Sequence, residues 1–409
     1  MTKLAIKLAW RNIWRNKRRS GVILTAIVVG LLGMVYMIAI MDGMSGDMVK
    51  VAIENGVSHV QIHKEGFLEN MTITLNIRSP EYVINKIEDM PGLKTYAERV
   101  KVRGLISSPE NSSGVLIWGI NHEREPKLNS IASYKVEGEF LSGKKGEIFI
   151  GKALAKKLKV ELDDKVVVRG QGLATEIVSE ALRIKGIYVS TSPEYDKYNI
   201  FINLKDSQSL FAMNDRVSEI ALMADDLDEV DSLAMNINKE IGVQGLKAET
   251  WKEIIPLIVQ MVEMFTAFNY IVFVIVVIAM AFGIVNTILM SVLERTREIG
   301  ILMAIGTKPI MVFGMVMWEG FFLGLLGLVF GWIIALFIYA ILSKTGIDFS
   351  IWADSLKYMG GIETIIYPII KGYNVFWSSF SVFIAAVLSA LYPAIKIMRL
   401  SPVKAFRSV

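Results

Sequence analysis

The sequence contains no cysteine and only three histidines, His59, His63 and His122, among its 409 residues. The absence of cysteine excludes disulfide bonds, thiol catalysis and cysteine metal sites. Three histidines provide few candidate residues for a serine–histidine triad or a zinc centre. We therefore expect no catalytic residue, no bound metal and no enzymatic activity in this chain.

The spacing of His59 and His63 would suit a shared metal ion only on a helix. The segment "SHVQIH" (Ser58–His63) alternates in the manner of a strand. Positions four apart in a strand are separated by about 13 Å, which is too far for one ion. We expect both histidines to be solvated or to lie at an interface.

A phosphate-binding loop is also lacking. The segment "GEFLSGKK" (Gly138–Lys145) approaches the pattern G-x-x-x-x-G-K-[ST], but Lys145 stands where Ser or Thr should ligate Mg²⁺. The segment also precedes an expected strand rather than a helix. We expect no nucleotide or other cofactor to bind here.

Charge is absent from four long stretches of a chain that is 53% hydrophobic, with a mean hydropathy of +0.45. A bilayer core about 30 Å thick needs about 20 apolar helical residues. Four stretches meet this length, namely Gly21–Met41, Met264–Leu293, Gly320–Ser343 and Gly372–Ile395. The first follows a basic N-terminus, as in a signal peptide, but its 21 uncharged residues exceed the apolar part of such peptides, so we expect a retained membrane helix.

Basic residues indicate the orientation of these helices. Residues 1–20 carry seven Lys and Arg and no acid, and the segments 294–308 and 396–409 are also net positive. Because Lys and Arg concentrate on the cytoplasmic side of membrane proteins, we expect both termini and the 294–308 loop to be cytoplasmic. Residues 1–20 also form an amphipathic pattern, with Ile6, Trp10, Ile13 and Trp14 on one face, which is typical of an interfacial helix on anionic lipid.

The expected fold class is an α-helical membrane protein with four transmembrane helices plus an α+β extracytoplasmic domain. Within that domain we expect strands at 58–63, 115–120, 147–150, 165–168, 183–189 and 199–204, and helices at 152–158 and 228–241. Helical spacing continues past the first membrane span to Gly56 and precedes the second span from Pro256, which predicts two stalk helices. The predicted order is an interfacial helix 1–20, TM1 21–41, the extracytoplasmic domain 42–263, TM2 264–293, a cytoplasmic loop 294–308, TM3 310–343, an extracytoplasmic loop 344–371, TM4 372–395 and a cytoplasmic tail 396–409.

Two features of the third span point to packing. Gly320, Gly324, Gly327 and Gly331 share one helical face, and small residues at that spacing let another helix approach closely in a bundle or a dimer. Glu319 precedes them as an acid within an apolar stretch. Such an acid either makes interhelical hydrogen bonds or acts in transport, and the sequence leaves both open.

The segment "ERTREIGILMAIGTKPIMV" (Glu294–Val312) places charges and one short amphipathic helix between two membrane spans. A loop this short cannot hold a domain, so its expected role is contact with a separate cytoplasmic protein. The longer segment "LMSVLERTREIGILMAIGTKP" (Leu289–Pro309) resembles the signature of FtsX-like permeases of ATP-binding-cassette systems. Three more segments resemble that family in the same order: Leu8–Gly30, Gly146–Val168 and Leu391–Arg407.

The resemblance implies a dimeric permease, made of two copies or of this chain and a paralogue, bound to two cytoplasmic ATPase subunits that carry ATP and Mg²⁺. In this family the 294–308 segment is the coupling helix, which implies ATPase-coupling roles for Glu294, Arg295, Arg297, Glu298, Gly300, Ala304 and Gly306. The segments His59–Phe67 and Gly346–Ile370 resemble the lipoprotein-releasing branch of the bacterial inner membrane.

That branch implies a lipoprotein cargo that enters between the first and second helices and leaves to a periplasmic carrier. Met34, Met37, Met41, Met44 and Met48 would then offer a deformable apolar surface to acyl chains, although core packing explains each of them equally well. Two alternatives remain, an efflux permease with a periplasmic adaptor and a regulator of a cell-wall hydrolase that transports nothing. The sequence does not identify the cargo.

Overall fold

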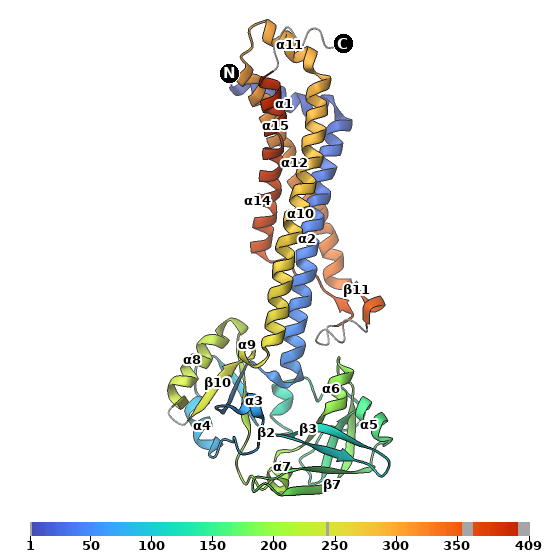
Figure 1. Cartoon of the computed structure of the whole chain (residues 1–409), viewed down its shortest axis with the longest axis vertical. Helices are drawn as coiled ribbons and strands as arrows, with labels where there is room; N and C mark the ends of the chain where they lie inside the picture. Colours follow the sequence, from blue (N-terminus) through green and yellow to red (C-terminus); the bar gives the residue numbers. More distant parts are fainter. Residues whose placement is uncertain (1, 243–244, 354–362, 400–409) are drawn as a thin grey trace. The chain divides into compact units, whose positions relative to one another are not determined.

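The computed structural model describes residues 2–242, 245–353 and 363–399. The chain divides into two units, a helical unit of residues 1–45, 262–349 and 365–409, and an α+β unit of residues 46–261 and 350–364 (Figure 1). The predicted fold class is confirmed, because four helices are long and apolar enough to cross a membrane and a separate part of the chain forms a mixed sheet.

The helical unit is built from seven helices of the described chain and a two-stranded hairpin. The helices are α1 (Thr2–Arg15), α2 (Lys17–Ala52), α10 (Pro256–Glu294), α11 (Thr296–Ala304), α12 (Pro309–Thr345), α14 (Gly372–Ser389) and α15 (Leu391–Met398). The hairpin pairs β11 (Ile347–Asp348) with β12 (Ile365–Ile366). Residues 354–362 of the expected 344–371 loop and residues 400–409 of the expected tail lie outside the described residues.

The fourth span is interrupted, whereas the sequence predicted one continuous helix over 372–395. Helix α14 ends at Ser389 and α15 begins at Leu391. Pro393 explains the break, because proline has no N–H to donate and its ring clashes with the carbonyl four residues earlier, at Ser389.

Helix α12 packs against neighbours of its own chain along the glycine face. A Cβ built on Gly320 would lie 2.6 Å from the Cβ of Ala390, and one on Gly327 would lie 2.5 Å from Cγ2 of Ile27 in α2. Gly324 faces Ala386 of α14 and Gly331 faces Leu31 of α2 in the same way. The four glycines thus bring α12 close to α2 on one side and to α14 and α15 on the other.

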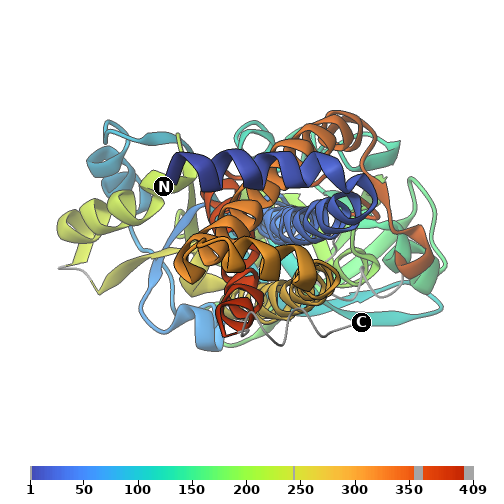
Figure 2. The ribbon, with the colours of Figure 1, turned by 90° about the horizontal axis from the view of Figure 1, so that it is seen from above.

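Helix α1 packs along α12, and Figure 2 shows it lying across the end of the helical unit. Its buried residues are Ala5, Ala9 and Ile13, four apart and therefore on one face. Trp10 and Trp14 remain substantially exposed, although Trp10 also meets the ring of Phe322 at 5.3 Å. The helix is therefore part of the bundle packing, and simple anchoring on lipid does not describe it fully.

The α+β unit contains one ten-stranded mixed sheet with the order β10-β1-β9-β2-β3-β8-β5-β7-β4, and β6 pairs with β2 and β7. The strands are β1 (Val60–Lys64), β2 (Leu93–Ser107), β3 (Ser112–Ile120), β4 (Lys135–Gly138), β5 (Glu147–Gly151), β6 (Lys165–Gln171), β7 (Ile177–Tyr188), β8 (Asn199–Asn203), β9 (Glu219–Ala224) and β10 (Leu246–Thr250). The helices are α3 (Phe67–Asn70), α4 (Pro80–Ile87), α5 (Lys152–Leu158), α6 (Pro193–Tyr198), α7 (Leu204–Leu210), α8 (Val230–Ile241) and α9 (Trp251–Ile254).

Two larger clusters of buried apolar side chains divide this sheet into lobes. One cluster joins α5 to strands β3 and β5–β8, and the other joins α4 and α8 to β1, β9 and β10. Strand β2 connects the lobes, because it pairs with β3 and β6 on one side and with β9 on the other. All six predicted strands and both predicted helices are present, whereas β2, the longest strand described, and the shorter β4, β9 and β10 were not predicted.

Candidate functional site

The loop between α10 and α12 is a short, well-terminated helix. The N–H of Gly306 donates to the carbonyl of Met303 and the N–H of Thr307 to that of Leu302, which is the Schellman ending of a helix. Gly306 has a φ of +99°, which a residue with a Cβ adopts only under strain. Pro309 then opens α12 at the first helical position, where its missing N–H costs nothing.

Helix α11 has a buried and an exposed face. Ile299 and Met303 pack on the helical core and Gly300 is buried. The exposed face carries Ile301 and Ile305, and the latter is 75% exposed. Of the residues predicted to couple to an ATPase, Glu294, Arg297, Glu298, Ala304 and Gly306 are exposed, Arg295 is half-buried, and Gly300 is not accessible.

A polar cluster joins this loop to the elbow between α1 and α2. Arg15 Nη2 lies 2.7 Å from Glu298 Oε2. Asn16 accepts a hydrogen bond from Arg295 Nη2 at 2.6 Å when its amide is turned to satisfy both of its polar atoms. The two contacts hold α11 against the end of α1.

Arg19 continues the cluster into the bundle. Its guanidinium contacts the hydroxyl of Ser291 on α10 and forms an ion pair with Glu319 on α12. The two charged side chains are only 12% and 9% exposed. The intramembrane acid singled out in the sequence therefore has a partner about 300 residues away, on a different helix.

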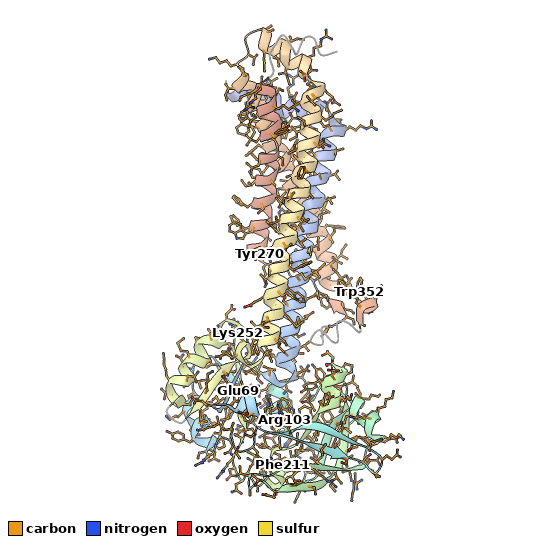
Figure 3. All side chains as sticks on the ribbon, in the orientation of Figure 1. Glu69, Arg103, Phe211, Lys252, Tyr270 and Trp352 are labelled. Carbon is orange, nitrogen blue, oxygen red and sulfur yellow. The ribbon has the colours of Figure 1, made fainter. Side chains whose placement is uncertain are left out.

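A pocket of about 480 Å³ lies between α2, α10 and α14. Its polar end is organised by Asp42, whose Oδ2 accepts from Asn374 at 2.6 Å and whose Oδ1 lies 3.7 Å from Lys371 Nζ. The lining is otherwise largely aromatic and aliphatic: Ile38, Asp42, Thr266, Asn269, Tyr270, Phe273, Tyr373, Asn374, Trp377, Ser378 and Ser381. Tyr270, which projects from α10, is labelled in Figure 3.

Two polar atoms in this lining are left without a hydrogen-bond partner among the described residues, Oδ1 of Asn269 and Oγ of Ser378. Buried polar atoms are usually satisfied, and exceptions call for an explanation. A mixed lining with free polar atoms suits an amphipathic ligand, which brings both an apolar chain and polar groups.

A buried charge cluster lies inside the α+β unit. Arg99 pairs with Glu125 at 2.7 Å and with Glu219 at 3.0 Å, and Lys101 Nζ lies 2.8 Å from Glu219. The arginine also donates to the carbonyl of Gly56 at 2.5 Å, in the π-helical turn Ile53–Val57 that ends α2. Burying several charges is tolerated only because each is paired, and the cluster fixes the end of α2 to the sheet.

His59 and His63 are both buried, so the expectation that they are solvated is wrong, and the alternative of an interface position stays a prediction. His63 lies in this cluster, 3.7 Å from a Glu219 oxygen and 3.6 Å from Glu249, and His59 accepts a hydrogen bond from the N–H of Ala224. Burial alone lowers the pKa of His63, but the two carboxylates outweigh it and raise that pKa above its ordinary value. Hydrogen bonding by His63 and then by Lys247 lowers the pKa of Glu249 to about 2.

Family comparison decides the class of protein. The MacB-like periplasmic core domain matches residues 20–240 and the FtsX-like permease C-terminal domain matches residues 270–402. The chain belongs to the FtsX-like and MacB-like permeases. It is therefore an ABC transporter permease, and permeases of this class work with a cytoplasmic ATPase.

Known relatives of this permease carry different names. The lipoprotein-releasing system transmembrane protein LolC of Neisseria meningitidis is 22% identical over 78% of this chain and 78% of its own. The macrolide export ATP-binding/permease protein MacB of Wolinella succinogenes is 21% identical over 99% of this chain and 60% of its own. The solved periplasmic region of MacB from Actinobacillus actinomycetemcomitans covers 50% of this chain at 12% identity with a TM-score of 0.36.

The permease's predicted cargo-facing methionines do not line the pocket. Met34 and Met48 are fully buried, and Met37, Met41 and Met44 are half-buried. From α2 the pocket takes Ile38 and Asp42 instead. Asp42 offered a signal in the sequence, because it is the first acid after a charge-free span, whereas Asn269 and Trp377 become neighbours only through the fold.

Proposed function

We propose that this permease uses ATP hydrolysis by a separate cytoplasmic ATPase dimer to extract lipidated proteins from the bacterial inner membrane toward a periplasmic carrier. The observation that carries the proposal is the pocket between α2, α10 and α14. In the proposed topology both termini and α11 are cytoplasmic and the α+β unit is periplasmic. The seven basic residues of 1–20 support this orientation.

The pocket answers the main energetic difficulty of extraction. Removing an acyl chain from the bilayer costs about 0.8 kcal/mol per CH₂, so three long chains would cost tens of kcal/mol unless the protein offers an apolar surface. Phe273, Tyr270 and Trp377 supply part of that surface, and Asp42 with Asn269 supplies polar groups for the lipidated end of the protein.

A second permease subunit would complete the surface. Helix α10 is the least buried of the four spanning helices, and its exposed apolar side chains form a long face: Tyr270, Ile271, Val274, Ile275, Ile278 and Phe282. The subunit is an identical copy or a paralogue. Acyl chains held between two such faces would be shielded from water.

Coupling to the ATPase uses the exposed face of α11. Ile301 and Ile305 offer an apolar contact, and Arg297 and Glu298 flank it with charges of both signs. Closure of the ATPase dimer around ATP would displace α11 and, with it, α10 and α12. For this motion to do work, the nucleotide must favour one of two discrete helix arrangements.

The test is the rate of ATP hydrolysis by the purified permease–ATPase complex in lipid, measured with a lipidated protein, with its unlipidated form and with neither. We expect stimulation by the lipidated form alone. Trp377→Ala, which opens the pocket wall, should reduce that stimulation, whereas the matched change Phe337→Ala, at an exposed position of α12, should not.

Efflux with a periplasmic adaptor is the second candidate, favoured by a relative that is named for macrolide export and spans 99% of this chain. Stimulation by a macrolide or a peptide, without any response to the lipidated protein, would replace our proposal with efflux. If the rate of ATP hydrolysis responds to none of these compounds although an ATPase is bound, the candidate function that remains is regulation of a cell-wall hydrolase.

A further inference from the structure

A second pocket, of about 500 Å³, lies at the elbow between α1 and α2, next to the last turns of α10. Its lining consists of five consecutive residues of the elbow and four of α10: Arg15, Asn16, Lys17, Arg18, Arg19, Thr287, Met290, Ser291 and Glu294. We propose that this elbow pocket binds the phosphate-bearing headgroup of an anionic phospholipid, in the leaflet on the side of α11.

The charge of the elbow pocket suits a phosphate group. Four cations line it against one carboxylate, Glu294. Arg15 and Arg19 already have carboxylate partners in Glu298 and Glu319. Within the residues that the structure describes, Lys17 and Arg18 are exposed and form no ion pair, so two cations of the pocket are free to meet an anion.

A buried donor points to the same ligand chemistry. Nε of Arg19 is enclosed and has no hydrogen-bond acceptor in the described part of the chain. A guanidinium with an unused N–H beside two free cations can form the short, charge-assisted hydrogen bonds that phosphate oxygens accept.

The surroundings favour a lipid over a soluble anion. The charge-free run Gly21–Met41 begins two residues after Arg19, so the cations lie where a membrane helix enters the bilayer. Val22 is one turn beyond Arg18 on the same face of α2 and is 57% exposed, and Met290 in the pocket wall is 59% exposed. The cations therefore adjoin apolar surface that acyl chains could cover, which is the arrangement of headgroup sites beside membrane helices.

A lipid bound here would touch the residues that hold the loop. Arg15 contacts α11, and Arg19 contacts α10 and α12. An anion shared by these cations would therefore change the strength of the contacts between the elbow and these three helices. This consequence depends on the proposed coupling function, whereas lipid binding itself does not.

The test measures the thermal stability of the purified full-length permease in neutral detergent, as phosphatidylglycerol, phosphatidylcholine or inorganic phosphate is added. We expect phosphatidylglycerol to raise the melting temperature saturably, and the other two to leave it unchanged at equal phosphate concentration. The variant Lys17→Gln/Arg18→Gln should weaken the response by at least about tenfold in concentration.

The matched control is Lys7→Gln/Arg11→Gln, which removes the same charge from exposed positions of α1 outside the elbow pocket. It should respond as the unmodified chain does. Both variants change exposed side chains, and their melting temperatures without lipid verify the fold. Equal loss of response in the two variants would overturn the proposal in favour of diffuse attraction, and an equal effect of inorganic phosphate would overturn it in favour of a soluble anion.

Discussion

Arg15 at the end of α1 and Glu298 on α11 form an ion pair with 2.7 Å between Nη2 and Oε2. Both side chains are more than half exposed, and exposed pairs contribute at most about 1 kcal/mol to stability. The pair therefore matters for where α11 is held rather than for whether the chain folds. The positive and negative charges can be exchanged between positions 15 and 298, so the role of each residue can be measured.

Reversing the charge of Glu298 or of Arg15 distinguishes a role in holding α11 in place from direct contact with the ATPase. We expect Glu298→Arg and Arg15→Glu each to lower ATPase copurification while shifting thermal unfolding little. If Glu298 acts only through Arg15, the double exchange Arg15→Glu/Glu298→Arg restores ATPase binding. If Glu298 touches the ATPase directly, the double variant stays defective, and unimpaired binding in every variant would remove α11 from the coupling interface.

The pair of Arg19 and Glu319 behaves differently because both side chains are buried. Removing one partner of a buried ion pair typically costs about 3–5 kcal/mol, whereas replacing both by apolar residues often costs little. We expect Arg19→Met and Glu319→Leu each to lower the melting temperature strongly, and the double variant to recover most of it. Arg11→Met, at an exposed position of α1, is the control.

This double variant also decides between the two roles of Glu319. If it folds and retains cargo-stimulated ATP hydrolysis, the acid is a packing element. If it folds and loses that stimulation, the acid acts in transport.

The close approach of α12 to α2 predicts a strict requirement for glycine. A Cβ on residue 327 would stand 2.5 Å from Cγ2 of Ile27, and forcing extra atoms into a packed core costs about 1–3 kcal/mol. We expect Gly327→Ala to lower the melting temperature and Ile27→Ala to compensate in the double variant. Gly314→Ala on the same helix meets no atom within 4 Å, so it should be neutral or stabilising, and equal effects at the two glycines would contradict the packing.

The cluster around His63 predicts a dependence of stability on pH. The pKa of His63 is raised in the folded state, so its contribution is fully present below the unfolded value of about 6.5 and is lost as the pH rises through the folded value. Lowered pKa values of Glu219 and Glu249 act in the opposite sense, because their contribution is lost as the pH falls below about 4.5.

Thermal unfolding followed by tryptophan fluorescence checks this, since Trp118 lies over the ammonium of Lys101 at 3.8 Å. We expect the unmodified chain to lose stability as the pH rises above about 6.5, and His63→Gln to lose that dependence. The control His122→Gln changes a partly exposed histidine outside the cluster. A His63→Gln profile parallel to that of the unmodified chain would show that His63 does not titrate with folding.

The sequence predicts the membrane helices well because long charge-free runs have few alternatives in a bilayer. Strand β2 was missed because Arg99, Lys101 and Arg103 make it look like a solvated segment, while the fold buries two of these charges against Glu125 and Glu219. Long-range pairing of this kind leaves no local signal.

In the candidate site, too, local features could be predicted from the sequence, whereas contacts between distant segments could not. The amphipathic pattern of α11 is local and could be predicted, and so could the isolation of Glu319 in an apolar run. That Arg19 pairs with it, and that Ile38, Asn269 and Trp377 share one pocket, depends on helices far apart in the sequence. Of the five methionines, Met34 is buried in the helical core and Met48 is buried in the α+β unit, whereas Met37, Met41 and Met44 are half-buried.

We propose that α11 transmits the nucleotide state of a bound ATPase to the pocket between α2, α10 and α14. The chain has no cysteine, so Ile38→Cys and Phe273→Cys place a unique thiol pair across that pocket. The measurement is the yield of cross-linking by a short bifunctional thiol reagent, with the ATPase bound, without nucleotide and after trapping with ATP. We predict different yields in the two states, with the difference abolished by Ile301→Asp on α11. Equal yields with the ATPase bound would show that α11 does not transmit the nucleotide state to the pocket.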